Sequence, residues 1–492
     1  MSRFATVSPG TKTENLAGGA AYTQSAKSEL VSLVLTSFVQ DDFYRKQQGQ
    51  LKRLQELLAG VDPLFAAKTA VYARHKFGMR SITHIIAGEM SKLGAGEPWV
   101  RRFYDKVVAR PDDITEILAY YLSIAQTNAN GKKKIAKSVQ AGLAKAFEKF
   151  DGYQLAKYRG EGKRPSLVDA VNLLHPVPVE KNKEALEKLI KGELRTEGTI
   201  ESVMSAAGEV EGTQEEKLEA KKEALSEIVK TRKIGYFALL RNLRNILQTA
   251  PEVAADAYAM LTNVKLIKNS KVLPFRYYAA YKEISQMGGQ LSREAMAQLD
   301  TAIGIACENV PALPGKTVVF LDVSGSMNQA TSEKSDMRVN EIAAVFAASL
   351  AKKLNCDIII FDDTAREMSY NPKDSFMTLV QKLKFNGGST NFHAPFKYIT
   401  DNKRKYDRII ILSDMQGWVG YYTPVHDYNQ YCATLGVKPN VVSWDLKGYG
   451  TVQFPESNVF LLAGWSEKLL DVLSRLEQDK NALIKDIEAV EI

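Results

Sequence analysis

The stretch KTVVFLDVSGS, residues 316–326, decides how the carboxyl-terminal part of the chain folds. Its β-branched and aromatic run is typical of a strand buried on both faces of a parallel sheet. Four similar runs follow: CDIIIFD (356–362), DRIIILSD (407–414), NVVSWDL (440–446) and NVFLLAG (458–464). Helical patterns lie between them, over 337–354, 374–384 and 391–401. We therefore expect residues 311–492 to form a doubly wound parallel α/β domain, entered through a Pro- and Gly-containing linker.

Oxygen-bearing side chains occur where these strands and one loop end. They are Asp322, Ser324, Ser326, Thr390 and Asp414. Open α/β sheets bind ligands at the carboxyl ends of their strands, so the five side chains are expected to converge. Carboxylates and hydroxyls suit Mg²⁺ or Mn²⁺, and no soft ligand nearby favours zinc. Ser389 is an alternative to its neighbour Thr390.

Catalysis by this domain is not expected. A hydrolase needs a base placed over its substrate, and neither His393 nor His426 has an evident Ser or Cys partner. The aromatic segment 421–431 (YYTPVHDYNQY) is expected either to pack on the domain or to form a recognition surface beside the metal.

Residues 28–310 show apolar positions at helical spacing in one segment after another, with short breaks containing Gly, Pro, Asp or Asn. Asp62 and Asp113 are expected to cap the helices that follow them. So many short paired helices indicate an α-solenoid with degenerate, HEAT-like repeats. The first 27 residues are polar and rich in Gly, Ser and Thr, so we expect a flexible amino-terminal arm.

Charge divides the chain unevenly. Residues 1–175 hold 26 Lys and Arg against 16 Asp and Glu, a net charge of +10. Residues 176–310 hold 19 of each, and residues 311–492 hold 20 against 22. The excess favours a polyanionic partner, nucleic acid before membrane, although a solvated lysine-rich surface explains the charge equally well.

Composition excludes several other classes of protein. The chain has 492 residues, of which 45% are hydrophobic and 25% charged, as in ordinary globular proteins. Its 3 cysteines are Cys307, Cys356 and Cys432, an odd number at distant positions, which indicates reduced thiols. No membrane-spanning run or secretory signal is seen, so a cytoplasmic location is expected.

The segment GYQLAKYRGEGKRPSLVDAVNLLHP (152–176) combines cations with aromatic rings, which suits phosphates and stacked bases. The residues of interest are Lys157, Tyr158, Arg159, Lys163, Arg164 and His175. Together with Ser166-Leu-Val-Asp169, with residues 38–58 and with the D-x-S-x-S strand end, this segment resembles the Ro autoantigen family. Members of that family join a TROVE domain to a von Willebrand factor A domain with a metal-ion-dependent adhesion site.

The resemblance implies a HEAT-like solenoid closed into a ring, with the α/β domain joining its ends. A basic outer surface, including Lys157, Arg159 and His175, would bind small non-coding Y-like RNA, and the hole would take single-stranded ends of misfolded RNA. The alternatives are solvated charge at Lys157 and Arg159 and a buried or capping role for His175. Ser324, Ser326 and Thr390 would bind the metal directly, and Asp322 and Asp414 through water. The family is not enzymatic, and bacterial relatives work with RNA degradation and repair. The chain departs from the pattern at Met415-Gln416, after the last metal residue.

Two hypotheses follow. The first is an RNA-binding quality-control scaffold, expected to be a monomer and associated with an exoribonuclease or RNA-repair protein. The second is a protein-binding adaptor that uses the metal site without RNA.

Overall fold

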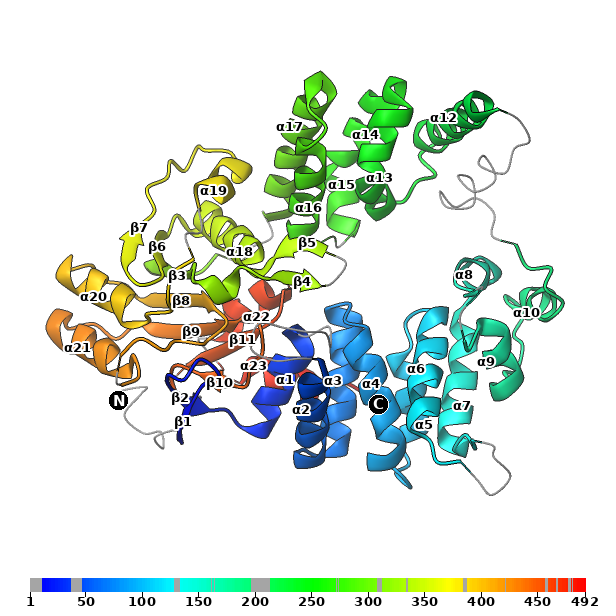
Figure 1. Cartoon of the computed structure of the whole chain (residues 1–492), viewed down its shortest axis with the longest axis horizontal. Coiled ribbons are helices and arrows are strands. Elements are labelled where there is room, and N and C mark those ends of the chain that lie inside the picture. Colours follow the sequence, from blue (N-terminus) through cyan, green and yellow to red (C-terminus); the bar gives the residue numbers. More distant parts are fainter. Residues whose placement is uncertain are drawn as a thin grey trace.

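The computed structural model describes residues 11–492 with internal gaps. The gaps are 37–46, 128–132, 161, 163, 196–212, 271, 273, 308–311, 333–334, 384–386, 421, 456–458, 466–467, 477–478 and 480. Two architectures share the chain: an arc of helices and an α/β domain (Figure 1).

The α/β domain contains a six-stranded sheet in the order β11-β9-β8-β3-β6-β7 (Figure 1). The strands are β3 (Thr317–Asp322), β6 (Asp357–Phe361), β7 (Ala365–Glu367), β8 (Arg408–Ser413), β9 (Asn440–Asp445) and β11 (Phe460–Ala463). All neighbours pair in parallel except β7, which lies antiparallel to β6 at the edge. Each of the five apolar runs thus became a parallel strand, and the doubly wound fold is confirmed.

Both faces of the sheet are buried because alternate side chains of each strand point to opposite faces. On β3, Val318 and Phe320 pack with the helices α20 (His393–Asp401) and α21 (Val425–Leu435). Val319 and Leu321 belong to a second, larger core that includes α18 (Val339–Leu354), α19 (Phe376–Lys382) and α22 (Lys468–Leu476). This second core continues without a break into the helical arc.

The helical arc runs from α1 (Ala26–Thr36) to α17 (Gly289–Cys307) (Figure 1). Its first limb contains α2 (Gln47–Gly60), α3 (Pro63–Lys76), α4 (Ser81–Leu93), α5 (Val100–Val107), α6 (Pro111–Ile124), α7 (Lys137–Ala146), α8 (Gly152–Lys157), α9 (Leu167–Leu174) and α10 (Lys183–Ile190). Its second limb contains α12 (Gln214–Lys230), α13 (Tyr236–Thr249), α14 (Ala254–Leu261), α15 (Val264–Ser270) and α16 (Pro274–Ser285). Stacked neighbours such as α5 and α7, or α16 and α17, confirm the HEAT-like solenoid. Among the described residues, no helix combines the length and apolar character needed to cross a bilayer.

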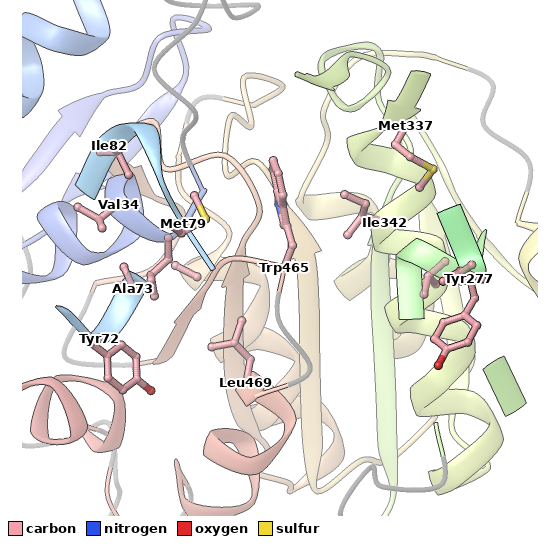
Figure 2. Close-up of a cluster of buried hydrophobic side chains, with 14 of the residues drawn as sticks. Val34, Tyr72, Ala73, Met79, Ile82, Tyr277, Met337, Ile342, Trp465 and Leu469 are labelled. Carbon is pink, nitrogen blue, oxygen red and sulfur yellow. The ribbon is translucent and has the colours of Figure 1, made fainter. Parts of the chain in front are cut away.

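The α/β domain closes this arc into a ring by contacting both of its ends. At the first joint α1 packs on β11, and Lys27 pairs with Glu488 of α23 (Ala482–Glu488) at 2.6 Å. At the second joint α16 packs on α18, where Glu341 accepts hydrogen bonds from Lys282 (2.7 Å) and Tyr278 (3.2 Å). Figure 2 shows buried apolar side chains at the two joints: Val34, Tyr72, Trp465 and Leu469 at the first, and Tyr277, Met337 and Ile342 at the second.

The amino-terminal arm was predicted to be flexible, and for residues 11–27 that prediction is wrong. β1 (Lys12–Glu14) and β2 (Ala20–Thr23) form a hairpin, and β2 also pairs with β10 (Thr451–Val452). Tyr22 is buried, and its hydroxyl lies 2.9 Å from that of Thr423. The strands are only 3 and 4 residues long, and their partner strand β10 lies at the far end of the chain, so no local pattern marks them.

Asp113 does not cap a helix from outside, as predicted, but lies inside the first turn of α6. Its carboxylate is buried and contacts Arg74 of α3 at 2.8 Å and His84 of α4 at 2.9 Å. Burial alone would raise the pKa of Asp113, but the hydrogen bond with His84 and the charge of Arg74 outweigh it and hold this pKa well below its usual range. Asp62 does cap α3, accepting from the Phe65 amide at 3.1 Å.

We predict that Asp113→Asn lowers the free energy of unfolding by about 3–5 kcal/mol, because Arg74 would be left buried beside a neutral group. A depressed pKa stabilises the fold above the unfolded pKa, about 3.9, and this contribution is lost as the pH falls toward the folded value. The variant should therefore lose part of the acid dependence of stability. Urea unfolding between pH 3 and 7 measures both effects. Asp401→Asn, in an exposed pair with Lys397, is the control and should cost under about 1 kcal/mol.

Candidate metal centre and basic surface

The metal centre begins where β3 ends. Asp322 is fully buried, and its Oδ1 accepts from the Ser324 amide at 2.9 Å. Its Oδ2 accepts from the hydroxyl of Ser413, the last residue of the neighbouring strand β8. The chain then turns through a short 3₁₀ helix, Gly325–Met327, which places the Ser324 and Ser326 hydroxyls 3.3 Å apart. Parallel pairing of β3 with β8 thus fixes the first carboxylate beside the second strand end.

A backbone hydrogen bond brings the 387–390 loop to the same place. The Gly325 amide donates to the Gly388 carbonyl at 3.0 Å. Thr390 is 2% exposed, whereas Ser389 is half-buried and its amide donates to Asp363. Burial at the strand ends therefore favours Thr390 over Ser389 as the oxygen donor.

Asp414 follows β8 and completes the set of five. Its Oδ2 is buried and makes no hydrogen bond within the described part of the chain. Burial raises the pKa of Asp414, with a further contribution from the charge of Asp322, and burial also raises the pKa of Asp322. Two neighbouring buried carboxylates, one with an oxygen that makes no hydrogen bond within the described residues, fit a site for a divalent cation.

The donor set depends on hydroxyls as well as carboxylates. The described residues hold no cluster of three or more His, Cys, Asp and Glu side chains placed to bind a metal ion. Two carboxylates and three hydroxyls form a hard set that leaves room for water, as Mg²⁺ prefers. Such a set would hold the ion and leave its water positions exchangeable.

The amino-terminal hairpin supports the loop that follows Asp414, a feature that sequence reasoning missed. Asn15 donates through Nδ2 to the Gly417 carbonyl at 2.5 Å, and the Leu16 amide donates to Gln416 Oε1 at 2.9 Å. Met415 adopts a left-handed conformation with φ of 60°. These contacts hold a strained turn directly beside the metal centre.

Part of the aromatic segment 421–431 packs in the core of the domain, and part of it is exposed at the surface. Tyr428 and Tyr431 of α21 are buried in the core. Tyr422 is 52% exposed and Trp418 is 48% exposed. The Trp418 amide also donates to the Thr390 carbonyl at 3.2 Å, so an exposed indole lies on the loop that contacts the metal centre.

The basic residues predicted to bind RNA gather around α8 and α9. Lys157 and His175 are exposed, and Arg164 is 91% exposed. His175 ends α9 in a left-handed conformation, and Lys163 lies outside the described residues. Arg110 covers one side of the Tyr158 ring at 4.4 Å, so that side is not open to a base.

A cavity of about 300 Å³ brings two of these arginines together with a third that was not predicted. Arg159, Arg164 and Arg195 line it, with Asp169 as the acidic residue of the lining. Arg159 donates to the Leu194 carbonyl at 2.5 Å, which fixes its guanidinium in the wall. Arg195 follows α10, and no aromatic residue or motif near it in the sequence suggested a binding role.

A ring of paired helices closed by an α/β domain, with an oxygen-donor cluster at the carboxyl edge of its sheet, defines a class of helical-repeat proteins that carry a von Willebrand A domain. Residues 22–226 and 205–357 match the TROVE domain, and residues 316–476 match the Ro60 vWA domain. The chain therefore belongs to the TROVE family of RNA-binding proteins, the family that its motifs resemble.

The crystal structure of the Deinococcus radiodurans RO (RSR) protein has the same fold, with a TM-score of 0.62 and 17% identity. The match covers 93% of this chain and 100% of that one. Telomerase protein component 1 of mouse is 31% identical over 140 residues, and that of rat 28% identical over 139. Each of these two matches covers 27% of this chain and 5% of the relative's length.

We predict that Gly19→Ala weakens the support of the metal loop. A methyl group at Gly19 would lie 2.0 Å from the Gly417 carbonyl oxygen and 2.5 Å from the Trp418 Cα, so backbone must move. Such overpacking costs about 1–3 kcal/mol in the free energy of unfolding. Gly60→Ala is the matched control, since nothing lies within 4 Å of its added carbon. Equal urea midpoints for the two variants would contradict the packing argument.

Proposed function

We propose that this protein binds small structured, Y-like RNA on its basic outer surface and single-stranded ends of misfolded RNA in its ring, as an RNA quality-control scaffold. The observation that carries the proposal is the cluster of exposed cations around the arginine-lined cavity of α8–α10. Arg159 and Arg164 belong to residues 1–175, which carry a net charge of +10, and Arg195 follows shortly after that segment.

Each element of this surface has a use in RNA binding. Lys157 and Arg164 extend into solvent, where they reach phosphates. Arg159 and Arg195 line a concave site in which a guanidinium contacts phosphate through two hydrogen bonds. Tyr153 is 48% exposed and offers a ring to an unpaired base, unlike Tyr158.

The RNA proposal predicts that the double variant Lys157→Glu, Arg164→Glu loses RNA binding. Both side chains extend into solvent, so the fold should persist when their charges are reversed. In electrophoretic mobility shifts the wild-type log K should fall with log salt by roughly 0.7 for each single-stranded phosphate contacted, and the variant should show a smaller slope. Lys397→Glu, an exposed lysine of α20, is the control. A slope near zero for the wild type, or equal binding by all three proteins, would refute the proposal.

We also propose that the metal centre holds Mg²⁺ and docks an acidic side chain of a protein partner, such as an exoribonuclease or RNA-repair protein. Mg²⁺ retains exchangeable waters, so a partner carboxylate can replace one of them. The exposed Trp418 beside Thr390 supplies apolar area next to that position. The exposed Trp418 is the specific observation that favours an adaptor role. The adaptor role is compatible with RNA binding on the basic surface around α8–α10.

Mg²⁺ should raise the thermal midpoint of the wild-type protein, because binding to the native state alone adds about 2.7 kcal/mol at a hundredfold excess over Kd. Thr390→Val keeps the shape of the side chain and removes its hydroxyl, so the response to Mg²⁺ should be largely lost. Ser389→Ala, one residue away, should keep it. Differential scanning calorimetry with and without Mg²⁺ measures the response. If Mg²⁺ still stabilised Thr390→Val but no longer stabilised Ser389→Ala, the hydroxyl of Ser389 would be the ligand instead.

A further inference from the structure

The turn formed by residues 415–417 lies between two of the candidate metal ligands. On one side it follows Asp414, whose Oδ1 accepts a hydrogen bond from the Gln416 amide at 3.2 Å. On the other side it leads into Trp418, whose amide donates to the Thr390 carbonyl at 3.2 Å. The shape of this turn therefore fixes where the Asp414 carboxylate and the Thr390 segment lie relative to each other.

One side chain of the amino-terminal hairpin ties this turn to the hairpin. Asn15, at the end of β1, donates through Nδ2 to the Gly417 carbonyl at 2.5 Å. Its Oδ1 accepts from the amides of Ala17 and Gly19 at 3.0 and 2.9 Å, within the turn between β1 and β2. Asn15 is only 6% exposed, so these bonds are shielded from bulk water. The same amide group thus joins the tip of the hairpin to the turn after Asp414.

The 415–417 turn has a conformation that needs support from outside. Met415 has a φ of 60°, in the left-handed region that a residue with a branched or long side chain seldom adopts. The hairpin supports the turn with a second bond, from the Leu16 amide to Gln416 Oε1 at 2.9 Å. From the side of β10, Gln453 donates to the Met415 carbonyl at 3.1 Å. An uncommon backbone conformation persists where surrounding contacts hold it, so the turn depends on these distant segments for its shape.

We propose that Asn15 is a positioning residue of the metal centre, and that it holds the 415–417 turn in the shape in which Asp414 and Thr390 serve one divalent cation. The inference rests on the Mg²⁺ centre proposed above. Loss of a group that orients metal ligands usually weakens metal affinity by about 10–100-fold. Coupling between two binding events is reciprocal, so the bound ion should favour the docked hairpin as much as the docked hairpin favours the ion.

The first test measures ion affinity in the full-length protein. Asn15→Ser keeps a short side-chain oxygen that can accept from the amides of the hairpin turn, but it no longer reaches Gly417. Calorimetric titration with MgCl₂ should show binding about tenfold or more weaker than in the wild type. Tyr22→Phe is the matched control, because it removes a hydrogen bond of the same hairpin, to Thr423, and leaves the 415–417 turn untouched. It should bind Mg²⁺ as the wild type does.

The second test needs no variant, so it decides the matter even if Asn15→Ser fails to fold. Lys12 lies exposed on β1, and trypsin can cut after it when the hairpin detaches from the domain. Cleavage tracks the population of the detached form when opening and closing are fast. Saturating MgCl₂ should therefore slow cleavage after Lys12 by about tenfold or more. Cleavage after Lys191, in the exposed turn that follows α10, is the internal control and should not change.

The outcomes separate this inference from the metal proposal on which it rests. Equal Mg²⁺ affinity in Asn15→Ser and the wild type would overturn the inference and leave the metal proposal intact. Equal losses of affinity in Asn15→Ser and Tyr22→Phe would show that hairpin stability alone matters, and would also overturn it, as would cleavage after Lys12 at the same rate with and without Mg²⁺. Absence of Mg²⁺ binding to the wild type would overturn both proposals.

Discussion

Burial of apolar surface at the two joints of the ring is the constraint on which the other features depend. A solenoid leaves an apolar face at each end that some element must cover. Here one α/β domain covers both ends, and one face of its sheet shares a core with the helical arc. Glu341 ties the second joint with hydrogen bonds from Lys282 and Tyr278. The sheet edge that carries the candidate metal centre is therefore fixed relative to both limbs of the ring.

Much of the fold was predictable because its signals are local. The runs that became β3, β6, β8, β9 and β11 are apolar over their whole length, as strands covered on two faces must be. The rule that ligands bind at the carboxyl ends of parallel strands then placed Asp322 and Asp414 together, 92 positions apart in sequence. Parallel pairing of β3 and β8 brings the two strand ends to one edge, and the structure confirms it.

What could not be predicted depends on contacts between distant segments. The strands of the β1–β2 hairpin are short, and β2 meets its partner strand, β10, only in the folded chain. Asp113 has the sequence context of a helix cap, but its role comes from Arg74 and His84 on two other helices. Local periodicity in the sequence predicts the helices and strands, but contacts between distant segments are seen only in the folded structure.

A basic surface and a carboxylate-lined metal centre can exist in one ring because of where the charges lie. The carboxylates of Asp322 and Asp414 are fully buried, so they do not face a polyanion at the surface. Exposed charges are screened beyond about 10 Å at ordinary salt, which separates the α8–α10 surface from the metal centre. The start of α18 connects the remaining parts. Asn340 donates to Asn328, just after the turn that carries Ser324 and Ser326, while the next residue, Glu341, binds Lys282 of α16. One helix terminus thus contacts both the loop of the candidate metal centre and the second joint of the ring.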